Sequence, residues 1–316
     1  MFAQSTILFS MLYMMSFILT ISCSDWFLIW LGLEINMMSF IVLFYNRSSN
    51  SIEVSMKYFF IQSIGSGFLM LMFYSEFFWM DLVGLSVLVY KMGGGPFYYW
   101  FPPICESIGW GSCMLLMTAQ KILPLLLVTF LVSNVLWLFI SMSLVIGGLG
   151  SLNQKSMKRL LAYSSIHHIG WILSSNFVNE SLWLVYLLMY SFMLGGVVYT
   201  LSKDKILEIS QLGKVSMKMM FVMGMLSMGG MPPMLGFYMK WWLFYNLMMI
   251  DLSMLLLMLV MSVIMFYVYL RVVYQVVMGG GVTSSWKMVS MNLNLSSLDM
   301  FYLMGVHVGV VLWMVV

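Results

Sequence analysis

Four ionisable residues lie deep inside apolar stretches of this sequence of 316 residues. Lys91, Lys121 and Lys240 each lie ten or more residues from at least one end of their stretch, and Glu34 shares their depth. A charged side chain at the centre of a bilayer costs roughly 2.5–3.5 kcal/mol on insertion scales, so such a residue is a candidate for function by default. Because burial favours the neutral amine, a buried lysine can release its proton when a partner moves. The chemistry that these residue types predict is a proton relay.

Two of the lysines accompany breaks in apolar helices. Lys91 lies two residues before the glycine-rich segment Gly93–Pro96, and Lys240 follows the segment Gly229–Pro233. Proline removes a helical hydrogen bond and clashes with the preceding turn, which frees backbone carbonyls. At membrane depth, broken helices mark transport sites. The sequence therefore predicts one broken helix in each half; the alternative is a packing kink beside a snorkelling lysine, which the depth of both lysines disfavours.

The remaining candidates lie on helices without a glycine-rich break. Thr118 precedes Lys121 by three residues, which predicts a small polar stripe on one helical face. Glu34 is the only deep carboxylate, so it is the natural partner of one lysine; a static ion pair is the alternative interpretation.

Two adjacent histidines lie in the segment 157–175. His168 shares a helical face with Ser164 and Ser175, which indicates a proton-relay role, with hydrogen-bonded packing as the alternative. His167 points about 100° away from His168, which argues against a shared metal ion.

Composition identifies the elements that must position these residues. The chain is 62% hydrophobic and 8% charged, with a mean hydropathy of +0.99, which no soluble domain of this length matches. We expect an all-α polytopic membrane protein with one membrane domain over residues 1–316 and no soluble domain. The broken-helix regions fall in about 3–100 and 108–316. Hydropathy predicts about eleven transmembrane helices, at about 3–22, 26–45, 54–75, 82–100, 108–131, 134–149, 157–175, 181–202, 217–247, 252–277 and 299–316.

The charges of the connecting loops support this count. Loops after even-numbered spans hold eleven lysines and arginines, whereas loops after odd-numbered spans hold none. The positive-inside rule then places the N-terminus on the inner side and the C-terminus on the outer side. The first apolar run has no basic flank or amphipathic presequence, so we expect a retained span.

Other chemistry is not indicated. The three cysteines lack metal-ligand spacing, and the basic residues form no single patch for nucleic acid. Gly65-Ser66-Gly67 lacks the third glycine of a dinucleotide fingerprint. We therefore expect no cofactor, no metal and no redox site in this chain.

Six motifs in order carry a family resemblance. They are Gly32–Asn36, Glu53–Phe59, Lys91–Trp100, Gln120–Pro124, Lys158–Trp171 and Gly229–Trp241. Together they resemble the antiporter-like membrane subunits of respiratory complex I, the proton-pumping mitochondrial NADH–ubiquinone oxidoreductase. The resemblance covers about residues 25–245, and the tail matches only in hydropathy.

The resemblance implies two inverted five-helix repeats, each with one broken helix. The family has fourteen helices, and its animal members lack the first three, so the resemblance implies eleven helices here. It implies that Glu34 and Lys91 interact, that Lys121 is the central relay lysine and that Lys240 serves the second half. Quinone reduction in other subunits would drive proton translocation, with FMN, iron–sulfur clusters and ubiquinone in partner subunits. The expected partners are other membrane subunits, including other antiporter-like chains, and the lipid bilayer. The expected location is the mitochondrial inner membrane, with the N-terminus in the matrix and the C-terminus in the intermembrane space.

The sequence departs from the family pattern at several positions. Tyr98 stands where many relatives have histidine, and Met239 replaces a proline before Lys240.

Two alternative functions stay open at this point. A stand-alone Mrp-type cation/proton antiporter is disfavoured by the short loops and the absent first helices, and a structural spacer is disfavoured by the cost of the deep charges.

Overall fold

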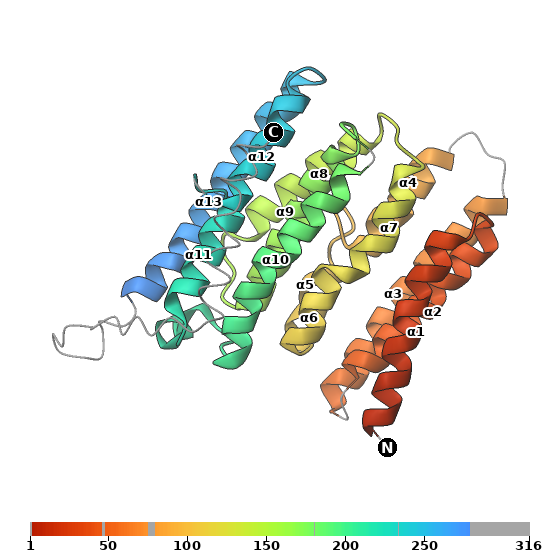
Figure 1. The fold of residues 1–316 in the computed structure, drawn as a ribbon, viewed down its shortest axis with the longest axis horizontal. Helices are drawn as coiled ribbons and strands as arrows, with labels where there is room; N and C mark the ends of the chain where they lie inside the picture. Colours follow the sequence, from red (N-terminus) through yellow and green to blue (C-terminus); the bar gives the residue numbers. More distant parts are fainter. Residues whose placement is uncertain (1, 46–47, 75–79, 180, 233, 279–316) are drawn as a thin grey trace. The chain divides into compact units, whose positions relative to one another are not determined.

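The computed structural model describes residues 2–45, 48–74, 80–179, 181–232 and 234–278. Within these ranges the chain forms thirteen α-helices and one short 3-10 helix, η1 (Figure 1). The all-α class is thereby confirmed. The α-helices are α1 (Phe2–Ser22), α2 (Trp26–Phe44), α3 (Ser49–Tyr74), α4 (Met80–Met92), α5 (Phe101–Ser107), α6 (Trp110–Met117), α7 (Ala119–Thr129), α8 (Leu136–Gly150), α9 (Met157–Ser175), α10 (Leu182–Lys203), α11 (Lys218–Gly229), α12 (Leu235–Leu247) and α13 (Leu252–Met278), and η1 is Ile209–Lys214.

Four of the described helices are long and apolar enough to cross a membrane by themselves. They are Trp26–Phe44, Trp110–Leu131, Leu182–Lys203 and Leu252–Met278. Four other apolar helices in the described ranges are shorter, and two of them, Leu82–Met92 and Lys218–Gly229, end where the chain leaves helical geometry inside a predicted span. The count of eleven spans stays a prediction, and the last of them, at 299–316, lies outside the described residues.

The chain divides into two compact units after Ser143. In the first unit, α1, α2 and α3 lie side by side (Figure 1). Aromatic rings join them: Phe40 of α2 packs 6.3 Å from Tyr13 of α1 and 5.5 Å from Tyr58 of α3, measured between ring centroids. Polar bonds add to this packing, because the Asn36 amide donates to the Ser16 hydroxyl at 3.0 Å. These contacts hold α2, which carries Glu34, against α1 and α3. Helix α3 also lines the first lysine site.

The predicted span at 108–131 is interrupted once, at Thr118, between α6 and α7. Pro124 has no N–H, and its ring crowds the carbonyl four residues earlier, so a regular helix is disfavoured here. Thr118 takes φ −122° and ψ −76°, and its hydroxyl donates to the Met114 carbonyl at 2.7 Å. The sequence analysis did not predict this interruption, which lies three residues before Lys121.

In the second unit, α9 is the most enclosed helix, with every residue from Ser164 to Ser175 buried. Its serines are compatible with burial because their hydroxyls donate to carbonyls of their own helix; Ser164, for example, bonds to Leu161 at 2.8 Å. These buried serine hydroxyls are therefore all hydrogen-bonded within α9. The histidines of α9 are held inside this buried surface.

Two loops and the last turns of α13 meet in the second unit. Ser156 forms a backbone bridge with Glu208, and the Arg271 guanidinium of α13 donates to the Leu152 carbonyl at 2.6 Å. Leu152 and Ser156 follow the sixth predicted span, Glu208 follows the eighth, and Arg271 lies near the end of the tenth. The side of the membrane that these segments face stays a prediction.

Gly147 of α8 allows a close approach to α9. A Cβ built at Gly147 would lie 2.5 Å from the backbone nitrogen of His167, closer than real Cβ contacts. Gly147→Ala is therefore expected to force α8 away from α9 and to reduce the amount of assembled protein severalfold. Quantification of the membrane-inserted chain would check this, with Gly111→Ala as control, since no atom lies within 4 Å of a Cβ there. Equal amounts of the two variants would contradict the tight contact.

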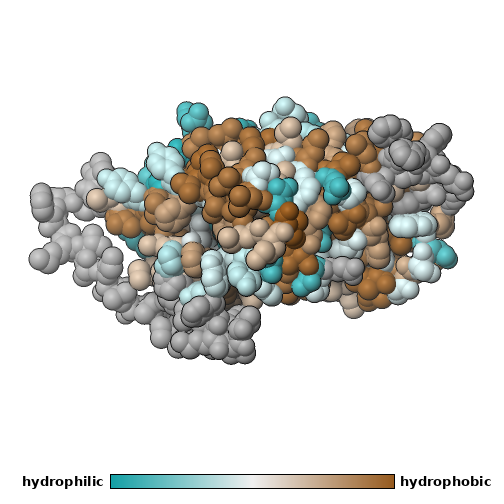
Figure 2. Space-filling view, turned by 90° about the horizontal axis from the view of Figure 1, so that it is seen from above, coloured by the Kyte–Doolittle hydropathy of each residue, from teal (hydrophilic) through white to brown (hydrophobic). Residues whose placement is uncertain are grey.

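Large apolar side chains are exposed along both units, including Leu71, Val263 and Tyr267. Figure 2 shows brown, hydrophobic residues over much of the visible face, with hydrophilic residues scattered among them. Such a surface is suited to lipid acyl chains or to the helices of other membrane proteins.

Candidate functional site

Lys91 lies at the end of α4, where the helix stops. The chain is non-helical from Gly93 to Trp100, and Gly93 has φ +70°, a left-handed conformation that favours glycine. The Lys91 side chain lies across Gly65 of α3, since a Cβ there would be 3.1 Å from its Cγ. Lys91 is 8% exposed, so the end of α4 buries its ammonium against α3.

Side chains satisfy the carbonyls that the end of α4 exposes. Gln62 of α3 donates to the Lys91 carbonyl at 3.1 Å, and the Trp100 indole donates to the Tyr90 carbonyl at 3.1 Å. The last carbonyls of a helix lack intrahelical partners, so these bonds stabilise the interruption inside an apolar environment. They also hold the backbone that carries Lys91.

Lys121 and Lys91 line the same small cavity. Its volume is about 10 Å³ for the centre of a water molecule, and the other polar residues at its wall are Tyr58, Gln62 and Gln120. Lys121 is 1% exposed, its ammonium lies 5.3 Å from the centre of the Phe101 ring, and the Cys105 thiol lies within electrostatic range. Two buried amines thus share one polar enclosure, although they are 30 positions apart in the sequence.

A hydrogen-bond network continues from this cavity toward α1. The Tyr58 hydroxyl donates to the Gln120 side-chain carbonyl at 3.4 Å, and the Gln120 amide donates to the Tyr13 hydroxyl at 3.3 Å. Sequence reasoning missed Tyr58, Gln62 and Tyr13, because tyrosine and glutamine carry no charge that would be costly in an apolar stretch. Two residues of this network lay within motifs of the family resemblance, Tyr58 in Glu53–Phe59 and Gln120 in Gln120–Pro124, and neither motif indicated that their side chains meet.

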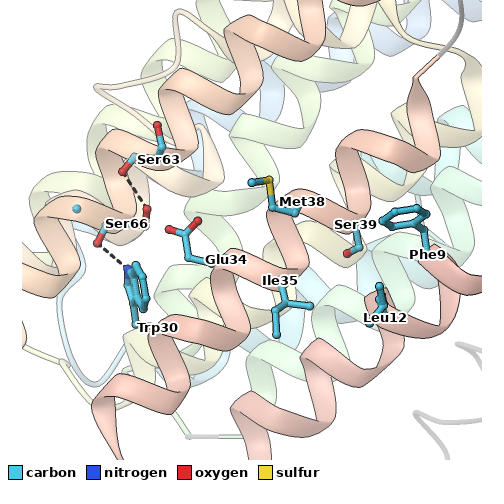
Figure 3. Close-up of a pocket in the computed structure, with 10 residues that line it drawn as sticks. Phe9, Leu12, Trp30, Glu34, Ile35, Met38, Ser39, Ser63 and Ser66 are labelled. Carbon is cyan, nitrogen blue, oxygen red and sulfur yellow. Dashed lines mark hydrogen bonds between the residues drawn. The ribbon is translucent and has the colours of Figure 1, made fainter.

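Glu34 points from α2 into the space between α2 and α3, beside Trp30 and Ser66 (Figure 3). It lines an open, largely apolar groove of about 610 Å³ that is formed by α1, α2 and α3. The Trp30 indole donates to the Ser66 carbonyl at 3.1 Å and so ties α2 to α3 at this level. The carboxylate acts on Lys91 electrostatically, although no direct salt bridge joins Glu34 and Lys91 in the described part of the chain.

Lys240 has the corresponding location in the second unit. The chain leaves helical geometry after Gly229, with Gly230 at φ +84°, and α12 begins at Leu235. The Lys240 ammonium reaches back to the end of α11 and donates to the carbonyls of Met228 and Gly229 at 3.2 and 3.0 Å. A lysine is thus the cap of the interrupted helix, where the helix dipole favours a positive charge.

His168 lies in a separate polar cluster of the second unit. Its Nδ1 lies 3.0 Å from the Tyr186 hydroxyl, and its ring packs 4.6 Å from the ring of Tyr190. Ser164, on the same face, lies beside the Tyr269 hydroxyl. The Ser175 hydroxyl donates to Ile172 of its own helix at 2.6 Å. A phenol next to an imidazole can pass or hold a proton.

His167, which the sequence analysis considered only as a metal ligand, contacts the Lys240 site instead. Its Nε2 accepts a hydrogen bond of 3.1 Å from the indole of Trp171, over whose ring the Lys240 ammonium lies. The structure therefore places Glu34, Lys91 and Lys121 in the first unit; in the second unit His167 contacts the Lys240 site through Trp171, while His168 belongs to a separate cluster with Tyr186.

Comparison with known proteins gives one consistent family. The model of the NADH:quinone oxidoreductase/Mrp antiporter transmembrane family matches residues 23–81 and 72–265. NADH-ubiquinone oxidoreductase chain 2 of Anopheles gambiae is 37% identical over 308 residues, which are 90% of each chain. A chain of respiratory complex I from Thermus thermophilus has a TM-score of 0.76 at 25% identity and covers 86% of this chain and 70% of its own length. A chain of the Mrp complex from Dietzia sp. has a TM-score of 0.70 at 16% identity, covers 79% of this chain and 56% of its own length, and shares the fold alone.

Proposed function

The chain belongs to the NADH:quinone oxidoreductase/Mrp antiporter transmembrane family, and we propose that it translocates protons as a core membrane subunit of the mitochondrial NADH–ubiquinone oxidoreductase. Quinone reduction in other subunits drives the translocation. One observation carries the proposal: two buried lysines, Lys91 and Lys121, line one enclosed polar cavity at a helix interruption. A purely structural protein has no use for two amines in this environment, because each is costly to bury.

The first half of the relay consists of Glu34, Lys91 and Lys121. The Glu34 carboxylate stabilises the ammonium form of Lys91 from beyond salt-bridge distance. When this field weakens, the Lys91 ammonium gives its proton to the amine of Lys121. The shared cavity has about the volume that one water molecule needs, and its polar wall supplies the partners for such a bridging water.

The second half of the relay consists of Lys240 and His168. Carbonyls of Met228 and Gly229 hold the Lys240 ammonium at the end of α11. His168, paired with the Tyr186 hydroxyl, accepts and returns protons as a neutral imidazole can. Relay through these residues requires each lysine to release one proton and to take up another in each cycle.

The membrane topology belongs to the same proposal. The non-helical segments after α4 and α11 support two broken helices, one in each of two inverted repeats, within eleven spans. The chain lies in the mitochondrial inner membrane, with the N-terminus in the matrix and the C-terminus in the intermembrane space. Other membrane subunits, including other antiporter-like chains, cover part of its apolar surface.

The redox centres of the enzyme lie in partner subunits. FMN, the iron–sulfur clusters and ubiquinone are held there, and this chain contributes proton transfer only. In the described residues, no group of three or more histidine, cysteine, aspartate or glutamate side chains could hold a metal ion. The enzyme is the whole complex, of which this chain is a subunit, and the similarity to NADH-ubiquinone oxidoreductase chain 2 supports this part of the proposal.

Copurification tests the proposal against the Mrp-type alternative. An affinity tag on this chain is expected to recover a detergent-stable complex that contains flavin and iron–sulfur subunits and oxidises NADH. The match to NADH-ubiquinone oxidoreductase chain 2 of Anopheles gambiae extends over 90% of that chain's length, which supports this outcome. Recovery of a stable, isolated chain that exchanges sodium for protons in liposomes would instead establish a stand-alone antiporter.

A further inference from the structure

Three side chains of the second unit form a stack that the proposed relay does not use in full. The Lys240 ammonium lies 5.7 Å from the centre of the Trp171 ring, within the range of a cation–π interaction. On α9, the Trp171 indole N–H donates to the Nε2 atom of His167 at 3.1 Å. His167, Trp171 and Lys240 are all buried, with Trp171 and His167 fully so.

The bond to Trp171 determines which ring nitrogen of His167 carries the proton. An indole N–H can only donate, so Nε2 must be the unprotonated acceptor and the neutral ring carries its proton on Nδ1. The Leu144 backbone lies near the ring, although Nδ1 makes no hydrogen bond of standard geometry in the described residues. Gly147, whose Cβ position lies 2.5 Å from the His167 backbone, keeps α8 close enough for this orientation.

We propose that His167 is a positioning residue that holds the Trp171 ring over the Lys240 ammonium and thereby keeps Lys240 in its relay position. This inference rests on the relay role of Lys240 proposed above. Without the bond at its N–H, the indole is free to turn about its side-chain torsions, and its face leaves Lys240. The ammonium then loses the cation–π contact and keeps its bonds to the Met228 and Gly229 carbonyls.

A direct proton-transfer role for His167 does not fit this geometry. The Nε2 atom of His167 is occupied by the Trp171 indole, and an indole N–H has no acceptor site through which a proton could pass on to Lys240. His167 therefore acts through the position of a neighbouring ring. This distinguishes it from His168, whose partner is the Tyr186 hydroxyl.

Two amide substitutions test the proposal in the assembled complex, reconstituted in liposomes and driven by NADH. His167→Gln places a carbonyl oxygen at about the reach of Nε2 and keeps the acceptor, whereas His167→Asn reaches only about as far as Nδ1. We expect His167→Gln to translocate protons per NADH close to the unmodified complex. His167→Asn is expected to lose roughly two- to tenfold in translocation rate, the size expected for one buried hydrogen bond.

Trp171→Phe provides the second variant, since it keeps an aromatic face while it removes the N–H donor together with the five-membered ring of the indole. It is expected to lose at least as much translocation as His167→Asn, and the double variant His167→Asn/Trp171→Phe is expected to be no worse than Trp171→Phe alone. Equal translocation by His167→Gln and His167→Asn, or additive losses in the double variant, would overturn the positioning role. Loss in both amide variants would show that titration of His167 is required and would overturn it as well.

A separate measurement distinguishes this inference from the relay on which it rests. Lys240→Gln keeps hydrogen-bond donors for the Met228 and Gly229 carbonyls and removes the charge. If Lys240→Gln translocates protons at the unmodified rate, the relay role of Lys240 fails. If Lys240→Gln is inactive while His167→Asn is unchanged, the relay stands and only the positioning role of His167 is overturned.

Discussion

Replacement of Lys121 by methionine is expected to abolish proton translocation by this chain and to uncouple or stop electron transfer. Lys121 shares a cavity with Lys91 and is 1% exposed, so no solvent-exposed group can substitute for its amine. Loss of a positioned acid–base group typically costs 10²–10⁴-fold in rate, and we expect a loss on the order of 10²-fold or more. Translocation per NADH in proteoliposomes, measured beside the rate of NADH oxidation, checks this result.

The substitution separates function from stability. Methionine is close to lysine in length and carries no charge, so Lys121→Met removes a burial cost of about 2.5–3.5 kcal/mol at bilayer depth. Assembly is therefore expected to be retained. Lys57→Met is the matched control, because Lys57 is exposed and pairs only with Glu53 on the surface of α3, an interaction of small energetic value. Full translocation with Lys121, Lys91 and Glu34 all neutralised would refute the relay.

Removal of the Lys240 charge is the second large effect we expect. Lys240→Gln should reduce proton translocation on the order of 10²-fold, because the amide cannot take up and release a proton at the end of α11. The glutamine amide still offers N–H donors to the carbonyls of Met228 and Gly229, which Lys240 now satisfies at 3.2 and 3.0 Å. Lys240→Met removes both the titratable amine and the hydrogen-bond donors, whereas Lys240→Gln removes only the amine. A comparison of translocation by the two variants therefore separates proton transfer by Lys240 from its role as the cap of α11.

The controls for Lys240 use the same unit. Lys214→Met removes an exposed lysine at the end of η1 and is expected to leave translocation and assembly unchanged. If Lys240→Gln is active and Lys240→Met is not, Lys240 is only a cap for the interrupted helix. Activity in both variants would exclude Lys240 from the relay and from any essential capping role.

The fold class followed from the sequence because its cause is compositional. A chain with 8% charged residues cannot cover a soluble surface, and a membrane leaves the helix as the natural form for such segments. The ends of α4 and α11 were predictable for a local reason, since glycine and proline act on the backbone at their own positions. The predicted span 82–100 nevertheless ends as a helix at Met92, because three glycines and Pro96 prevent helix resumption until Phe101.

The interruption at Thr118 shows where local reasoning failed. Pro124 was visible in the sequence, but it lies inside α7, whereas the interruption falls at Thr118, whose backbone N–H and hydroxyl both donate to the Met114 carbonyl. Proline inside a membrane helix is tolerated in several geometries, so the sequence could not choose among them. The contacts of α7 with α4 and α6 decide the outcome.

The sequence by itself determined which groups are costly enough to require a function: Glu34, Lys91, Lys121 and Lys240 are charged residues in apolar segments, and the price of burial depends only on residue type and depth. Tertiary structure alone decided which of them meet. Lys91 and Lys121 share a cavity, whereas the neutral Tyr58, Gln62 and His167 became part of the sites although their burial carries no comparable cost. Contacts between helices depend on packing across many residues, and periodicity within one helix does not contain that information.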